Sequence, residues 1–129
     1  RISATDWAEG GWNADQSVEL ARTLKDHGVD LVDVSTGGLI DGVTIPVKPG
    51  YQVSFADRIR AKAGVPTTAV GLITKPRQAQ KIVAHGQADA VEIGRAALRD
   101  PYWPLRAAAK LGVERARIPY PPQYLRGAW

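Results

Sequence analysis

The sequence predicts an α/β fold in which four parallel strands alternate with helices, as in one half of a (β/α)8 barrel. Short apolar segments at residues 1–4, 29–35, 67–70 and 88–93 are separated by segments whose apolar residues recur at helical spacing. The helical segments before the last end at glycines and lead within a few residues into the next strand, which favours parallel strands and right-handed crossovers. A complete barrel needs roughly 250 residues, so a chain of 129 supplies about half of one.

The first helix is predicted at residues 13–28. Asn13 is a good N-cap, and Gln16 stands three residues later in the capping-box position. Val18, Ala21 and Leu24 then recur on one face of the helix. The largely apolar run at 29–35 is typical of a strand buried on both faces of a parallel sheet.

A long excursion follows this second strand, and a second helix follows the excursion. Residues 39–53 contain two glycines and two prolines, which exclude a continuous helix, and a long loop at a strand end is often functional. We expect Ser54 to cap the second helix and Gly64 to end it, before the strand at 67–70.

The last part of the chain repeats the strand and helix alternation and then changes character. We expect Thr74 to cap a third helix with Pro76 in its first turn, and Asp100 to cap a last helix that runs to about residue 112. Residues 1–112 thus form the half barrel. Residues 113–129 contain three prolines and are predicted to be an extended tail at a subunit interface.

Two strand-to-helix turns carry the most specific chemical signal. The strand at 67–70 leads into Gly71 and Leu72, and the strand at 88–93 leads into Gly94 and Arg95. A glycine lets a ligand approach the backbone closely, and an arginine offers a positive fork suited to phosphate. Adjacent turns of this kind are expected after the seventh and eighth strands of a barrel, where they share one phosphate. The competing interpretation is a pair of ordinary turn glycines beside a solvated arginine.

Composition narrows the possible classes of protein. The formal charge is +4, but the basic residues are spread along the chain without interleaved aromatics, which argues against nucleic-acid binding. The absence of cysteine excludes disulfides and thiolate metal sites within these residues, and no metal site is expected.

There is no apolar run of membrane-spanning length and no signal peptide, so we expect a cytoplasmic protein without membrane contact. The absence of methionine suggests a fragment.

A set of segments spread over essentially the whole chain forms a specific pattern: RISATDW (1–7), GVDLVDVSTGG (28–38), PGYQV (49–53), AVGLIT (69–74), IGR (93–95), LRDP (98–101) and QYLRG (123–127). Taken together and in this order, the segments resemble the C-terminal half of an old yellow enzyme, a (β/α)8 or TIM-barrel family. The similarity is greatest to the thermophilic-like branch, which includes bacterial ene-reductases and chromate reductases.

This resemblance implies a flavoprotein oxidoreductase that uses FMN. In such an enzyme the flavin takes a hydride from NADPH or NADH and passes it to an activated alkene such as an enone, a maleimide or a nitroalkene. The resemblance places Arg1 at the pyrimidine edge of the flavin, where a cation stabilises the reduced ring. The alternative interpretation of Arg1 is a solvated residue at the end of the chain, without a contact to the flavin.

The resemblance also assigns phosphate and subunit contacts. Gly71, Leu72, Gly94 and Arg95 match positions that hold the FMN phosphate, and Arg126 matches an arginine that enters the active site of a neighbouring subunit in a dimer. The partners implied are the N-terminal half of the barrel, a second copy of the protein and a small-molecule substrate. The family's substrate-gripping histidines, proton donor and flavin-ring contacts lie in that N-terminal half, so no catalytic residue is assigned here.

Other titratable residues are expected to be structural. Asp33 and Glu92 lie in predicted strands, and buried carboxylates satisfied by amides or an arginine are a simpler interpretation than paired-carboxylate catalysis. His27 and His85 lie near the ends of helices, without partners at metal-ligand spacing.

Two other functions remain open at this stage. One is a different TIM-barrel enzyme, such as an aldolase or an isomerase, that binds a phosphorylated substrate at the same turns. The other is an inactive fragment that needs its N-terminal half.

Overall fold

The chain forms a four-stranded parallel sheet with helices on one side. The structure is a computed structural model that describes residues 1–129. Its strands are β1 (Ile2–Ser3), β2 (Val32–Ser35), β3 (Thr67–Ala69) and β4 (Ala90–Val91), in the spatial order β1-β2-β3-β4. All three pairings are parallel. The predicted α/β fold with parallel strands and crossover helices is therefore confirmed.

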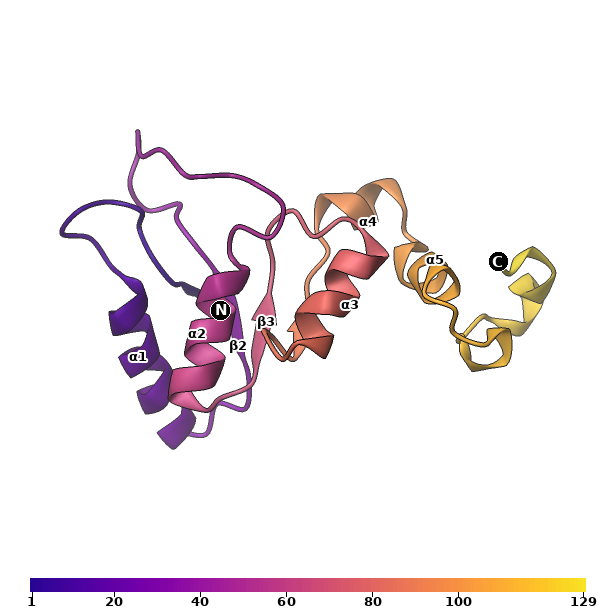
Figure 1. Cartoon of the computed structure of the whole chain (residues 1–129), viewed down its shortest axis with the longest axis horizontal. Helices are drawn as coiled ribbons and strands as arrows, with labels where there is room; N and C mark the ends of the chain where they lie inside the picture. Colours follow the sequence, from indigo (N-terminus) through magenta and orange to yellow (C-terminus); the bar gives the residue numbers. More distant parts are fainter.

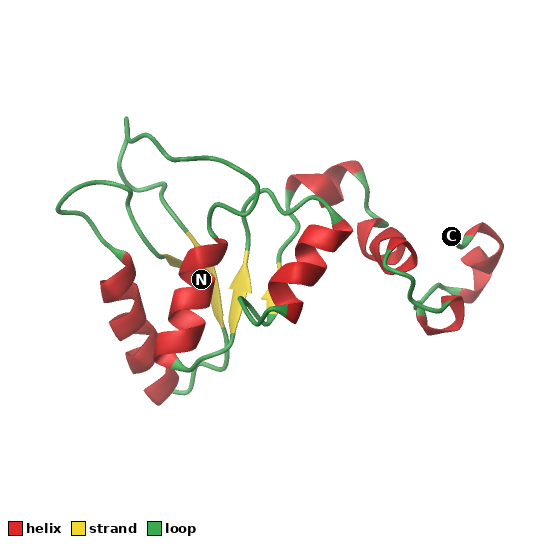
Figure 2. Cartoon of the chain, viewed as in Figure 1, coloured by secondary structure: helices red, strands yellow, loops and turns green.

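Helices α1 (Ala14–Asp26), α2 (Val53–Ala63) and α3 (Pro76–Ala84) connect the successive strands and lie on the same face of the sheet (Figures 1 and 2). Two short helices, α4 (Arg95–Arg99) and α5 (Trp103–Lys110), follow β4. Since each connection returns to start a parallel strand, the carboxyl ends of all four strands meet at one edge of the sheet, where barrel enzymes carry their sites.

The hydrophobic core lies between the sheet and its helices. Val32 and Val34 of β2 are buried against apolar residues of the helices, among which Ala21 and Ile59 are 0% and 1% exposed. Because side chains alternate along a strand, Asp33 and Ser35 point to the opposite face. That face is the interior of the barrel, and in this chain it is polar.

The helix boundaries correct several predicted caps. Asn13 forms the predicted capping box with Gln16. Ser54, Thr74 and Asp100 are not caps, since α2, α3 and α5 begin after Gln52, Lys75 and Tyr102, none of which makes a side-chain capping bond. The starts of α2 and α5 are instead tied to distant segments, since Gln52 donates to the carbonyl of Val70 and Trp103 donates to that of Thr74. The start of α3 is tied to the preceding turn through Gln78.

Strand lengths and the tail also differ from expectation. The second and fourth strands are shorter than the apolar runs at 29–35 and 88–93. The tail at 113–129 is not extended: it contains the 3-10 helices η1 (Arg115–Arg117) and η2 (Pro122–Gly127). Proline is compatible with the first turn of such a helix, and Pro122 occupies that place in η2.

The tail leads away from the sheet to the far end of the molecule (Figure 1). It is joined to the half barrel through α5, whose Trp103 is 6% exposed and donates from Nε1 to the carbonyl of Thr74 at 3.1 Å. No helix combines the length and the apolar character needed to cross a lipid bilayer.

Candidate functional site

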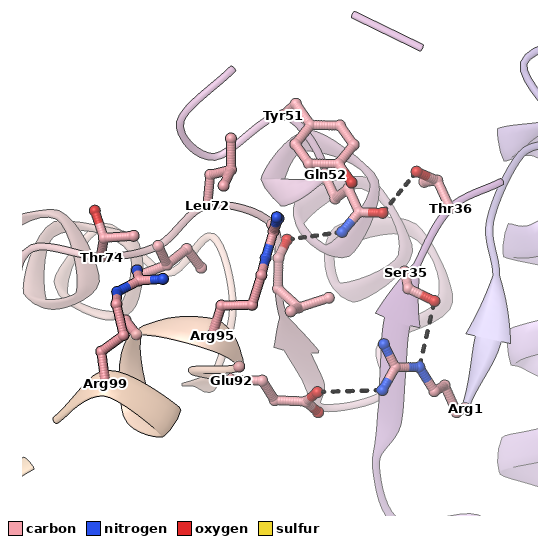
Figure 3. Close-up of a pocket in the computed structure, with 15 residues that line it drawn as sticks. Arg1, Ser35, Thr36, Tyr51, Gln52, Leu72, Thr74, Glu92, Arg95 and Arg99 are labelled. Carbon is pink, nitrogen blue, oxygen red and sulfur yellow. Dashed lines mark hydrogen bonds and ion pairs between the residues drawn. The ribbon is translucent and has the colours of Figure 1, made fainter. Parts of the chain in front are cut away.

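A pocket of about 430 Å³ lies at the carboxyl ends of the strands. Five of the six site residues predicted from sequence line it, and Arg126 does not. The pocket is within the size range of small-molecule sites. In Figure 3, Arg1 and Ser35 lie on one side of the pocket, Arg99 lies on the other, and Arg95 lies between them. The residues that line it are Arg1, Ser35, Thr36, Tyr51, Gln52, Val70, Gly71, Leu72, Ile73, Thr74, Glu92, Gly94, Arg95, Ala96 and Arg99.

The turn after β3 has an unusual backbone. Gly71 has φ +119° and Leu72 has φ +51°, so two consecutive residues occupy the left-handed half of conformational space. A Cβ on residue 71 would come within 2.9 Å of Gln52 Nε2 and 3.0 Å of Tyr51 Cε1. Glycine is therefore required at position 71, whereas Leu72 adopts its positive φ at a cost in conformational energy. Strain of this kind is concentrated at functional sites.

The turn after β4 is open toward the pocket. A Cβ built on Gly94 meets no atom of the chain within 4 Å. Arg95 begins α4, and Arg99 follows one turn later on the same side of the helix. Neither arginine takes part in an ion pair within the chain. Two uncompensated guanidinium groups on one wall suit the pocket to an anion.

The opposite wall carries a compensated cation. Arg1 Nη1 lies 3.3 Å from Asp33 Oδ2 and 3.6 Å from Glu92 Oε2, and its Nε donates to Ser35 Oγ at 3.4 Å. Thr68 Oγ1 donates to Glu92 at 2.7 Å and lies 3.3 Å from Asp33. The two carboxylates thus hold the guanidinium of Arg1, as expected for carboxylates satisfied by an arginine. They are half-buried, whereas the sequence predicted buried carboxylates.

Comparison with known proteins identifies the family to which the chain belongs. The sequence profile of the NADH:flavin oxidoreductase / NADH oxidase family matches residues 1–114. The chain belongs to this family. It is 50% identical over 127 residues to an NADPH dehydrogenase of Geobacillus thermodenitrificans, and 49% and 47% identical over 129 residues to NADPH dehydrogenases of Listeria monocytogenes and Bacillus licheniformis. These alignments cover 98–100% of the chain and 36–37% of the relatives.

Membership of the NADH:flavin oxidoreductase family confirms the resemblance to old yellow enzymes and the TIM-barrel fold class. The chain spans just over a third of the length of these curated relatives and contributes four of the eight strands of a barrel. Family membership also sets aside the alternative of an aldolase or an isomerase.

Some residues that line the pocket were not predicted from the sequence. Gln52 is 4% exposed, and Arg99 lines the pocket beside Arg95. The spacing of four between Arg95 and Arg99 was a usable signal, because it places both on one side of a helix. Gln52 gave no such signal, since its partners Thr36 and Val70 are distant in sequence.

The remaining sequence candidates lie away from the pocket. His27 and His85 are the C-cap residues of α1 and α3, near the helix ends where they were expected. No group of three potential metal ligands occurs in the chain. Arg126 is exposed in η2, and this segment, yellow in Figure 1, lies beyond α5 from the sheet.

Proposed function

We propose that this chain binds the phosphate of FMN in an NADPH-dependent flavin oxidoreductase. The observation that carries the proposal is the convergence of the turns at Gly71 and Gly94 on one pocket whose wall holds Arg95 and Arg99 without carboxylate partners. This supports the two-turn phosphate site expected for the last strands of a barrel. The conclusion applies to a protein in which the other four strands are present.

The residues of the pocket fit the phosphate end of FMN. Arg95 extends into the pocket between Leu72 and Gln52 (Figure 3). A guanidinium there donates two parallel hydrogen bonds to phosphate oxygens, while the open space at Gly94 lets the backbone approach them. Arg99 adds a second positive charge on the same wall.

The residues on the other side fit the ring end. FMN, when bound, supplies an isoalloxazine ring that accepts a hydride and donates it. Arg1 is the cation available for the pyrimidine edge of that ring, and Asp33 and Glu92 fix its guanidinium before any ligand arrives. A fixed cation stabilises developing negative charge without reorganising, which favours accepting a hydride.

The reductant and the substrate follow from the relatives and from the resemblance. The curated relatives are NADPH dehydrogenases, so we propose NADPH as the hydride source and keep NADH as the alternative to be measured. Activated alkenes, namely enones, maleimides and nitroalkenes, are the proposed acceptors. The cytoplasm is the proposed location.

The tail is proposed to contact a second copy of the protein. Tyr124 and Trp129 are 62% and 55% exposed, which is unusual for large aromatic side chains. A dimer contact would cover these two side chains. Arg126 does not line the pocket of its own chain, so we propose that the same contact brings it to the pocket of the partner.

The test is the substitution Arg95→Ala in the full-length protein. Loss of a charge-assisted contact of about 1.5–3 kcal/mol weakens FMN binding roughly tenfold to a hundredfold. Quenching of FMN fluorescence by the apoprotein measures the dissociation constant. Arg77→Ala is the matched control, since Arg77 is exposed on α3 outside this pocket. Unchanged FMN affinity in the Arg95 variant would falsify the phosphate assignment.

The wild-type spectrum tests the cofactor itself. A flavoprotein absorbs near 450 nm, a rough value for oxidised flavins in general. A colourless full-length protein that does not bind added FMN would contradict the proposed function.

A further inference from the structure

We infer that Gln52 and Gln78 are positioning residues that hold the turn at 70–74 in the conformation that binds phosphate. The inference rests on the proposed function, because it concerns the same pocket. Gln52 precedes α2, and Gln78 lies in α3, so the two side chains reach the turn from different helices.

Three consecutive carbonyl groups of this turn are occupied by donors. Gln52 Nε2 donates to the carbonyl of Val70 at 3.1 Å, and Gln78 Nε2 donates to that of Leu72 at 3.1 Å. Between them, the backbone N–H of Gly50 donates to the carbonyl of Gly71 at 2.8 Å. Each carbonyl is thereby turned toward the helices.

The orientation of the carbonyls fixes the orientation of the next amides. In a planar trans peptide the C=O of one residue and the N–H of the next point in opposite directions. The N–H groups of Gly71, Leu72 and Ile73 therefore point away from the three donors. None of these three groups donates a hydrogen bond within the chain, and all three residues line the pocket. They remain available to an anion.

The two glutamines are themselves fixed. Thr36 Oγ1 donates to Gln52 Oε1 at 2.7 Å, and the backbone N–H of Thr74 donates to Gln78 Oε1 at 3.1 Å. With each side-chain oxygen accepting a hydrogen bond, each NH₂ group is directed to its carbonyl. Gln78 does not line the pocket, so it acts on a ligand only through the backbone of Leu72.

The turn needs such support because of its backbone. Leu72 holds φ +51°, directly after Gly71 at +119°. A leucine in the left-handed region is strained, and such residues persist only where the surrounding structure over-determines them. Without the glutamine hydrogen bonds the turn relaxes and its free N–H groups lose their common orientation.

The experiment compares FMN with riboflavin, which lacks the phosphate, in the full-length protein. Gln78→Met and Gln52→Met remove the donors at similar side-chain volume without adding charge. Gln80→Met is the control, because Gln80 is exposed on α3 and its side chain makes no hydrogen bond, unlike that of Gln78. We expect Gln78→Met and Gln52→Met each to weaken FMN binding about tenfold, the effect of one lost hydrogen bond, with riboflavin affinity unchanged.

The outcomes separate this inference from the proposed function. If wild-type protein binds FMN no better than riboflavin, both fail. If Arg95→Ala removes the preference for FMN but Gln78→Met retains it, the positioning role alone is overturned. An equal loss of both flavins in Gln78→Met also overturns it, since a general structural defect does not discriminate phosphate. A variant that binds riboflavin is folded. If Gln52→Met fails to fold because Gln52 is buried, Gln78→Met alone tests the inference.

Discussion

The two pocket glycines differ in what a side chain would meet. Gly71→Ala forces a methyl group to within about 3 Å of Gln52 and Tyr51 in a left-handed conformation. We expect this change to destabilise the full-length protein by about 1–3 kcal/mol, because neither the backbone nor the packed neighbours can give way freely. Urea denaturation of the apoprotein measures the loss.

Gly94→Ala is the matched comparison for that prediction. Its added methyl group meets no atom of the chain, so apoprotein stability should stay within about 0.5 kcal/mol of wild type. FMN affinity should nevertheless fall, because the methyl group occupies the space through which the ligand approaches the backbone. A Gly94 variant that unfolds like the Gly71 variant, or that binds FMN normally, would contradict this distinction.

At the scale of the elements, an ion pair at the amino ends of the strands joins α2 to the strands β3 and β4. Arg60 Nε and the N–H of Thr67 both donate to Asp89 Oδ2, each at 2.9 Å. The hydrogen bond from Arg60, followed by that from Thr67, lowers the pKa of Asp89, and the same pair raises the pKa of Arg60.

This pair predicts a dependence of stability on pH. A carboxyl whose pKa is lowered on folding contributes stability above its unfolded pKa of about 4, and the contribution is lost as pH falls through the folded pKa. Because the pair is partly exposed, Asp89→Asn should lower the melting temperature of the full-length protein by only about 1–2 °C at pH 7, and the difference from wild type should shrink below about pH 4. Thermal denaturation from pH 3 to 7 measures this, with the exposed Asp41→Asn as control. A difference that stays constant with pH counts against the ion pair.

The elements show which features of the fold were predictable from sequence. The apolar runs and terminal glycines predicted the order of elements, and the capping box at Asn13 predicted a helix start, because these signals are local. The observed starts of α2 and α3 lie within two residues of the expected caps Ser54 and Thr74, and boundaries of this kind are the least predictable part of a helix. The prolines of the tail were poor guides, because Pro122 lies in the first turn of η2.

The site divides in the same way. Gly71 and Gly94 converge because the parallel strands β3 and β4 end at one edge, which the strand order predicts. Arg1 precedes β1 and reaches the pocket beside Asp33 of β2. Gln52 was missed because its partners Thr36 and Val70 are distant in sequence. Gln78 was also missed, although its partners Thr74 and Leu72 lie in the adjoining turn.

At the scale of the whole molecule, the chain is a half barrel with an appended tail. Strands β1 and β4 each have one neighbour, and the polar face with Asp33, Thr68 and Glu92 is the interior side of the sheet. Unpaired edges favour association with further strands. The proposed flavin site is thus shared with the rest of the barrel, and the proposed role of Arg126 extends the site to a second subunit.

Subunit mixing tests that extension. Arg126→Ala removes only the residue proposed to act across the interface, and Arg95→Ala weakens the FMN site of its own subunit. In a hybrid dimer of the two full-length variants, the Arg126 variant keeps its FMN site and receives Arg126 from its partner. Random mixing of equal amounts makes half of the dimers hybrids with one complete site each, so about a quarter of wild-type activity should return.

NADPH oxidation with a maleimide acceptor, measured before and after the subunits are exchanged, gives the recovered activity. Each variant alone should remain well below this level, and a mixture of Arg95→Ala with the double variant Arg95→Ala/Arg126→Ala should recover nothing. The double variant is the decisive control because it forms the same dimers without supplying either missing group. If Arg126 served the pocket of its own chain, no pairing of the single variants would restore a complete site, and the mixture would show only the mean activity of its components.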